Sequence, residues 1–464
     1  MTVKIREKER AAILSSLGAG VVPAIGLQHV QVGRKAELAA LISDLQRVES
    51  GGAAVRFVVG RFGSGKSFFL NLLKAVALER KLVVANADIT TDRRLNGGGG
   101  VARALFTELT RNIATRAKPE GGALASIVER WIGDLAHQVT SSGGSDADVH
   151  ARIAQTLRPL QDLVSGYDFA TVLSAYYRGH AEHNAELQTA AVRWLRGEFT
   201  TKTEARTALG VRTIIDDESI YDYLKLMAAF VRLAGYAGLV VCVDELVVLS
   251  HRLNNSASRD RNYEAILRIV NDCLQGSVEG LMFIFAATDD CLTDQRRGLF
   301  SYEALATRLA ENRFAANGLV DLSGPVIRLA SLTPEDCFVL LCNVRRVFAR
   351  GENEQSVLSD QAIEHYLHSC HQRMGAASFQ TPRETIKDFV GLLNVLEQNP
   401  GADWRTLVGG LTARAPAEPP PEPDAPDEPG TPAQAAAGQS GKASKSKDPA
   451  KPTDKEDDLA SFKM

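Results

Sequence analysis

The feature that most constrains this chain is a glycine-rich loop between a strand pattern and a helix pattern. Apolar residues 55–59 predict a buried strand, and after the loop apolar residues recur at helical spacing from Phe69 to Val76. The loop at residues 60–67 reads Gly-Arg-Phe-Gly-Ser-Gly-Lys-Ser and fits G-x-x-x-x-G-K-[ST] throughout. Glycines here allow backbone amides to turn onto phosphate oxygens without a clash from Cβ. The unit predicts a phosphate-binding loop; a glycine turn without nucleotide is the alternative.

The side chains of this loop suit the parts of a nucleoside triphosphate. Lys66 brings a positive charge to the β and γ phosphates, and the Ser67 hydroxyl is a ligand for Mg²⁺. The helix that follows adds the positive end of its dipole. We therefore expect ATP and Mg²⁺ to bind at eight residues: Gly60, Arg61, Phe62, Gly63, Ser64, Gly65, Lys66 and Ser67.

A second apolar strand pattern, at residues 239–243, ends in the carboxylates Asp244 and Glu245. We expect Asp244 to hold Mg²⁺ together with Ser67. Glu245 follows by one residue, where it could polarise a water for attack on the γ-phosphate. The alternative is an acidic pair that only closes a buried strand.

A third strand pattern, at residues 281–287, is followed by Thr288, Asp289 and Asp290. A neighbouring central strand would end beside the phosphates, so Thr288 is a candidate sensor of the attacking water. A simple strand-ending turn is the alternative for Thr288. We expect Asp289 and Asp290 to be capping residues.

The order of these patterns predicts an α/β fold with a parallel sheet. We expect N-terminal helices over residues 1–50, an α/β core at 51–94 and 236–331, an α-helical insertion at 95–235, a helical lid at 332–408 and a disordered tail at 412–464. The lid opens with Thr333, a good helix cap, and Pro334, which fits the first helical position. The tail could not bury enough apolar area to offset its ordering entropy.

Composition and charge limit the possible partners. The net charge of −3 gives no global attraction to nucleic acid or anionic lipid, and the apolar runs are shorter than the roughly 20 residues of a membrane helix. The basic pairs Arg93-Arg94 and Arg345-Arg346 are expected on solvated faces. Six scattered cysteines without a C-x-x-C pair, and a charged N-terminal segment, indicate reduced thiols in a cytoplasmic protein.

These parts together, with Gly33-Arg34 and the helical lid, resemble the AAA+ ATPases, and among them the ATP-binding proteins of BREX phage-defence systems, the BrxC and BrxD family. The similarity runs over most of residues 6–405. It is carried by Gly20-Val21-Val22-Pro23, the segment 26–34, the loop followed by Phe68-Phe69, the segment Thr91-Asp92-Arg93-Arg94-Leu95, and Gln380-Thr381-Pro382-Arg383.

The resemblance implies further roles in the nucleotide site. Val32, Gly33 and Arg34 would lie near the adenine, and Arg383 would be the sensor 2 arginine of the lid. A surface helix arginine is the alternative for Arg383. The resemblance also implies a homo-oligomeric ring, but its size cannot be transferred, because the insertion separates Lys66 from Asp244 by 178 residues.

The resemblance further implies a biological role. The chain would be an ATP-hydrolysing component of an antiphage system, with a methyltransferase, a helicase or an alkaline-phosphatase-like protein as partner. Contact with DNA stays open, and no membrane partner is expected. The alternative is a nucleotide-operated switch or scaffold that turns over ATP slowly.

Arg308 and Arg313 lie between the third strand pattern and a last one at residues 326–329. The resemblance implies that this region faces the next subunit of an AAA+ ring. An arginine there could neutralise charge on the γ-phosphate, since its charge is permanent and its planar fork spans two oxygens. Either residue is a candidate for this role. The alternative is an ordinary salt bridge, such as Arg308 with Glu311.

Three histidines at helical spacing, His365, His368 and His371, could align metal ligands on the lid. No carboxylate or cysteine set completes a recognisable site. We therefore expect solvated histidines.

Overall fold

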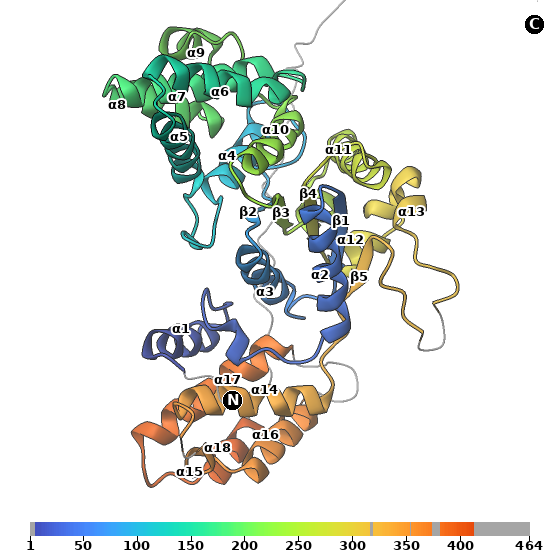
Figure 1. Cartoon of the computed structure of the whole chain (residues 1–464). Helices are drawn as coiled ribbons and strands as arrows, with labels where there is room; N and C mark the ends of the chain where they lie inside the picture. Colours follow the sequence, from blue (N-terminus) through green and yellow to red (C-terminus); the bar gives the residue numbers. More distant parts are fainter. Residues whose placement is uncertain (1–4, 316–318, 353, 374–380, 413–464) are drawn as a thin grey trace, which may run out of the picture. The chain divides into compact units, whose positions relative to one another are not determined.

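In the computed structural model the described residues are 5–315, 319–352, 354–373 and 381–412 (Figure 1). Among them, five strands form one parallel sheet in the order β2-β3-β4-β1-β5. The strands are β1 (Ala53–Val59), β2 (Val83–Asp88), β3 (Leu239–Asp244), β4 (Leu281–Ala287) and β5 (Val326–Arg328). The expected α/β fold with a parallel sheet is confirmed, whereas the expected tail lies outside the described residues except for Thr412.

The strand order brings three distant chain segments to one edge of the sheet. β4 lies between β1 and β3, with Phe285 in register with both Phe57 and Val243. Parallel strands end at the same edge, so the glycine loop after β1, the acidic pair at the end of β3 and Thr288 after β4 are neighbours. The amide of Gly60 also donates a hydrogen bond of 3.2 Å to the carbonyl of Ala287.

Each face of the sheet is covered by helices, which explains why the strands read as continuous apolar runs. Alternate residues such as Ala54 and Val58 pack with helices α2 (Lys35–Glu49) and α3 (Lys66–Glu79). Phe57 and its neighbours on the opposite face join a larger apolar core that also contains α11 (Ser256–Gln275).

That larger core continues into the helices of residues 95–235. They are α4 (Val101–Arg111), α5 (Leu124–Ser141), α6 (Asp146–Gln161), α7 (Gly166–Ala181), α8 (Ala185–Leu195), α9 (Lys202–Leu209) and α10 (Ile220–Leu233). The large apolar side chains of these helices are buried in this core, among them Trp131, Phe169 and Trp194. Asp217, just before α10, accepts hydrogen bonds of 2.9 Å from the first amides of α4, those of Ala102 and Arg103.

A separate apolar cluster joins both ends of the described chain. Helix α1 (Glu7–Gly18) contributes Ile13 and Leu17 to a core made otherwise mostly of C-terminal helices. These helices are α14 (Pro334–Phe348), α15 (Glu354–Val357), α16 (Asp360–Arg373), α17 (Pro382–Gln398) and α18 (Trp404–Thr412). The predicted cap is confirmed, because Thr333 Oγ1 accepts a hydrogen bond of 3.1 Å from the amide of Asp336.

The expected solvated face is wrong for Arg345. Its side chain is buried, donates to the carbonyl of Leu358 at 2.7 Å and forms an ion pair of 2.7 Å with Asp360. These two partners compensate the buried charge. Arg93 is partly buried and pairs with Glu108 at 3.3 Å.

No disulfide joins the six cysteines, all of which belong to described segments. The described fold also contains two short α-helices, α12 (Asp289–Thr293) and α13 (Glu303–Leu309), and three short helices of other types, η1 (Leu27–His29), η2 (Val248–Arg252) and η3 (Leu299–Ser301). Of the helices in the described ranges, none has the length and apolar character needed to cross a bilayer.

Candidate active site

The glycine loop needs glycine at particular positions. Gly63 and Gly65 have φ angles of 75° and 89°, which side-chain-bearing residues rarely adopt. A Cβ atom at Gly60 would lie 2.7 Å from Ser64 Oγ. Helix α3 begins at Lys66, directly after Gly65, and the first amides of a helix have no partners within it. The loop therefore presents a helix N-terminus that suits an anion.

Lys66 lies across the loop and is partly buried. Its Nζ donates hydrogen bonds to the carbonyls of Gly60 at 2.8 Å and Arg61 at 3.0 Å. Burial lowers the pKa of Lys66, while the carboxylates of Asp244 and Glu245 act against this shift. Two backbone carbonyls thus hold the ammonium beside the loop, and phosphate oxygens could replace them as hydrogen-bond acceptors.

The loop and the end of β3 are in direct contact. Ser67 Oγ donates a hydrogen bond of 2.9 Å to Asp244 Oδ2, and the amide of Glu245 donates to Asp244 Oδ1 at 2.8 Å. A hydroxyl and a carboxylate are hard oxygen donors of the kind that Mg²⁺ prefers. This donor pair fits the predicted magnesium site.

Glu245 has an uncommon backbone conformation. Its φ angle is 58°, in the left-handed region that few residues other than glycine adopt, and such strain gathers at functional sites. The residue as a whole is exposed to solvent, although neighbouring atoms partly shield its carboxylate. Partial burial by nearby atoms, followed by the charges of Asp244 and Asp88, raises the pKa of Glu245, and Lys66 acts in the opposite direction.

Asp88 is a residue of this site that sequence reasoning missed. It ends β2 in register with Asp244, so a third carboxylate lies beside the acidic pair. Partial burial, and then the charge of Asp244, raise the pKa of Asp88. The signal was present in the sequence, because Asp88 directly follows an apolar strand as Asp244 does.

Thr288 lies at the end of β4, between the loop and the acidic pair in the sheet order. Its Oγ1 accepts a hydrogen bond of 3.2 Å from the amide of Cys291 and so caps α12. The expected capping role of Asp289 and Asp290 is therefore wrong: both lie in the first turn of this helix, and Asp289 instead pairs with Arg328.

Gly33 and Arg34 approach the loop from the N-terminal side. Both have left-handed φ angles, 64° and 56°. The Arg34 guanidinium donates to the carbonyl of Ser64, and also to that of Ala330 at 3.4 Å. Burial lowers the pKa of Arg34. These contacts tie the start of α2 to the glycine loop.

A single cleft collects most of the predicted site residues. Gly33, Arg34, the loop from Phe62 to Ser67, Asp244, Glu245, Thr288 and Arg383 all line it. Its remaining wall is largely apolar and comes from several segments: Leu17, Val21, Val22, Val30, Val32, Leu72, Leu332, Leu340 and Ile386. A cleft with a phosphate-binding end and an apolar end matches the two halves of a nucleotide.

Arg383 reaches the cleft from the first turn of α17. Its Cζ atom lies 5.3 Å from the centroid of the Phe62 ring, in the glycine loop. Arg383 is also near enough to Lys66 for its charge to lower the lysine pKa. Two cations thus face the phosphate-binding end of the cleft.

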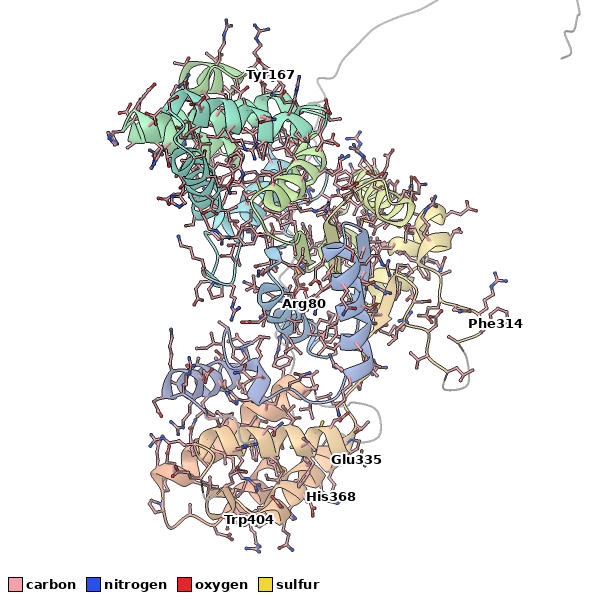
Figure 2. The ribbon with its side chains drawn as sticks, in the orientation of Figure 1. Arg80, Tyr167, Phe314, Glu335, His368 and Trp404 are labelled. Atoms are coloured by element: carbon pink, nitrogen blue, oxygen red, sulfur yellow. The ribbon has the colours of Figure 1, made fainter. Side chains whose placement is uncertain are left out.

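Arg308 and Arg313 do not line this cleft. Arg308 donates to Asn271 Oδ1 at 2.5 Å and to the carbonyl of Ala304 at 2.8 Å. The alternative salt bridge with Glu311 is wrong, because Glu311 follows the end of α13 and pairs with Arg328. Arg313 is exposed, next to Phe314, which projects from the loop after α13 in Figure 2.

The histidines of α16 form no metal site with the side chains that the structure describes. The His365 ring packs edge-on against Trp404 with centroids 5.5 Å apart, and His368 Nε2 lies 2.7 Å from Gln372 Nε2. His368 and Trp404 are labelled on the C-terminal helices in Figure 2. The side chain of His371 lies outside the described residues.

Comparison with known proteins bears on this geometry. Curated proteins give no match to the chain. A family model described as BREX system ATP-binding protein BrxC/D matches residues 5–411, which span the sheet, the cleft and the C-terminal helices. A match over nearly the whole chain shows that the protein belongs to the BrxC/BrxD family of BREX system ATP-binding proteins.

Proposed function

We propose that this chain is an AAA+ ATPase that binds ATP with Mg²⁺ in the cleft and hydrolyses it with Glu245 as general base. The observation that carries the proposal is the hydrogen bond of 2.9 Å between Ser67 and Asp244. It joins the helix that follows the glycine loop to the strand that ends in the acidic pair. This is the spatial arrangement that magnesium-dependent phosphoryl transfer needs.

The phosphates bind at the start of α3. The first amides of that helix and the Lys66 ammonium hold the β and γ phosphates, and the ammonium exchanges its carbonyl partners at Gly60 and Arg61 for phosphate oxygens. Ser67 and Asp244 hold Mg²⁺, which when bound neutralises charge on the phosphates.

Glu245 accepts the proton of the attacking water. Its raised pKa makes its carboxylate a stronger base than that of an ordinary glutamate. Thr288 orients the same water. Its Oγ1 already accepts one hydrogen bond from Cys291, but its hydroxyl proton can still be donated.

The base of the nucleotide binds the apolar end of the cleft. Val32 and Leu332 belong to its wall, and the Arg34 side chain fixes the glycine loop beside it. The C-terminal helices act as a lid that contributes Arg383, which contacts the γ-phosphate. Either Arg308 or Arg313 completes the site of a neighbouring subunit in a homo-oligomer.

Membership of the BREX family supports a role in antiphage defence in the cytoplasm. In this role ATP turnover drives the remodelling of other system components or of DNA. The partner classes to be tested are a methyltransferase, a helicase and a phosphatase-like protein.

The proposal is tested by Mg²⁺-dependent ATPase assays of the whole chain. Glu245→Gln should keep ATP binding but lose turnover, because an amide cannot accept the proton. Glu279→Gln is the matched control. Glu279 is exposed and lies just before the start of β4, whereas the site lies at the other end of that strand. Turnover of Glu245→Gln at the wild-type rate would remove Glu245 from the mechanism. Tight ATP binding with almost no wild-type turnover, even with partners and DNA added, would favour the switch or scaffold.

A further inference from the structure

Phe62 is an unexpected side chain for its place in the glycine loop. Its ring is 68% exposed to solvent and belongs to none of the three apolar clusters. Exposing a large aromatic ring at a ligand-binding loop gives no benefit in core packing. The contacts of the Phe62 ring are therefore made outside the apolar core.

One such contact is with Arg383, whose guanidinium lies over the Phe62 ring at 5.3 Å from the centroid. A cation over an aromatic face is attracted by the negative charge of the ring face. Among the described residues, no carboxylate forms an ion pair with Arg383. Within the described part of the chain, the Phe62 ring is thus the group that attracts the Arg383 guanidinium at close range.

The backbone holds these two residues at close range. A Cβ atom at Gly63 would lie 2.7 Å from Thr381 Cβ, so glycine is needed for the loop to approach the start of α17. On the other side, a Cβ atom at Gly20 would lie 3.6 Å from Arg383 Cγ. The arginine side chain therefore passes beside Gly20 to reach the ring of the loop.

An anion in the cleft would compete for this guanidinium. Arg383 and Lys66 are both cationic and both line the phosphate-binding end. An exposed contact between a cation and a ring changes an equilibrium by about two- to fivefold. Charge-assisted hydrogen bonds from arginine to a phosphate are stronger.

We propose that Phe62 is a positioning residue whose ring holds Arg383 while no γ-phosphate is present, and that the γ-phosphate of ATP draws the arginine off the ring. This inference rests on the proposed contact between Arg383 and the γ-phosphate. ADP lacks that phosphate and leaves the pair intact. The contact consequently opposes ATP binding and leaves ADP binding unaffected, which makes Phe62 a determinant of nucleotide selectivity.

The experiment compares dissociation constants for Mg-ATP and Mg-ADP by calorimetry on the whole chain. All variants carry Glu245→Gln so that ATP is not consumed. Phe62→Ala should tighten ATP binding about two- to fivefold and leave ADP binding unchanged. Phe62→Leu should behave like Phe62→Ala, because leucine is apolar but has no aromatic face. Phe62→Trp supplies a ring that attracts a cation more strongly than phenylalanine does. Its ratio of ATP affinity to ADP affinity should therefore equal that of the parent or be lower.

A double-mutant cycle with Arg383→Ala isolates the contact. In the Arg383→Ala background, Phe62→Ala should no longer change the ratio of the two affinities. An equal change in ATP and ADP affinity, or an effect of Phe62→Ala that persists without Arg383, would overturn the inference.

Failure of the proposed function looks different. If Arg383→Ala leaves the ratio of ATP to ADP affinity unchanged, Arg383 does not contact the γ-phosphate and both proposals are wrong on that point. If Arg383→Ala weakens ATP binding alone and the Phe62 variants do nothing, the lid function stands and only the role of Phe62 is refuted. Circular dichroism of each variant confirms folding, which the exposure of Phe62 should leave intact.

Discussion

Ser67 Oγ donates a hydrogen bond of 2.9 Å to Asp244 Oδ2, although 177 residues separate the two along the chain. Residues 95–235 account for most of that separation; their helices join the apolar core on one face of the sheet, and none of the residues that line the cleft comes from them. The strand order consequently brings Ser67 and Asp244 together.

Lys66→Ala should weaken ATP binding by at least about a hundredfold, because the phosphates lose their fixed cation and the helix N-terminus binds them weakly alone. Titration with a fluorescent ATP analogue measures the change. Lys202→Ala, which removes an exposed lysine at the start of α9, is the control and should bind normally. Unchanged ATP affinity in folded Lys66→Ala would show that the nucleotide binds elsewhere.

Turnover should fall at acidic pH with a midpoint above 4.5, the ordinary pKa of a glutamate, because the pKa of Glu245 is raised. The sign follows from the role of a base: as pH falls through this pKa, Glu245 gains a proton and can no longer accept one. The pH dependence of kcat/KM, which reports ionisation of the free enzyme, measures the midpoint.

Asp88→Asn tests the cause of that midpoint. It removes one negative charge beside Glu245 and should move the midpoint to lower pH. Asp290→Asn is the control: it removes an exposed carboxylate of α12 and should leave the midpoint unchanged. If Asp88→Asn leaves the midpoint unchanged, the loss of turnover at acidic pH cannot be assigned to protonation of Glu245.

Arg313→Ala should leave ATP affinity nearly intact and lower turnover by at least about tenfold, if this exposed arginine completes the site of a neighbouring subunit. Arg308→Ala should lower turnover less, because its guanidinium is already engaged by Asn271 and Ala304 in its own chain. ATPase assays at several protein concentrations measure both.

Mixing Arg313→Ala with Lys66→Ala provides the decisive control. Each variant supplies the half-site that the other lacks, so mixed oligomers should regain activity. Absence of rescue, in mixtures where mixed oligomers are shown to form, would exclude an arginine acting between subunits.

Asp44→Ala should lower the free energy of unfolding by about 3 to 5 kcal/mol, because it leaves the buried charge of Arg56 without its carboxylate. Arg56 Nε lies 2.6 Å from Asp44 Oδ2, and both side chains are almost fully buried between α2 and β1. Urea denaturation followed by circular dichroism measures the loss.

The matched control is the partly exposed ion pair between Glu49, the last residue of α2, and Arg80, which directly follows α3 and is labelled in Figure 2. Glu49→Ala should cost less than about 1 kcal/mol. Equal losses for the two variants would mean that burial does not set the cost of breaking the Asp44 pair.

The sequence by itself determined the elements whose signals are local. Strands β1, β3 and β4 were predicted because a strand buried on both faces has to be apolar at nearly every position. The glycine loop was predicted because backbone conformation and phosphate chemistry restrict its residues, and Thr333 because a helix cap acts within three residues. Membership of the BREX ATP-binding family was also visible in the sequence.

Only the tertiary structure decided which side chains meet. The packing of α1 with the C-terminal helices, the approach of Asp88 to the acidic pair and the burial of Arg345 depend on strand order and on contacts between distant segments. The contact between Phe62 and Arg383 likewise requires the start of α17 to lie against the glycine loop. Local periodicity specifies which face of an element is apolar but not which element covers it, so these relationships arise only when the chain folds.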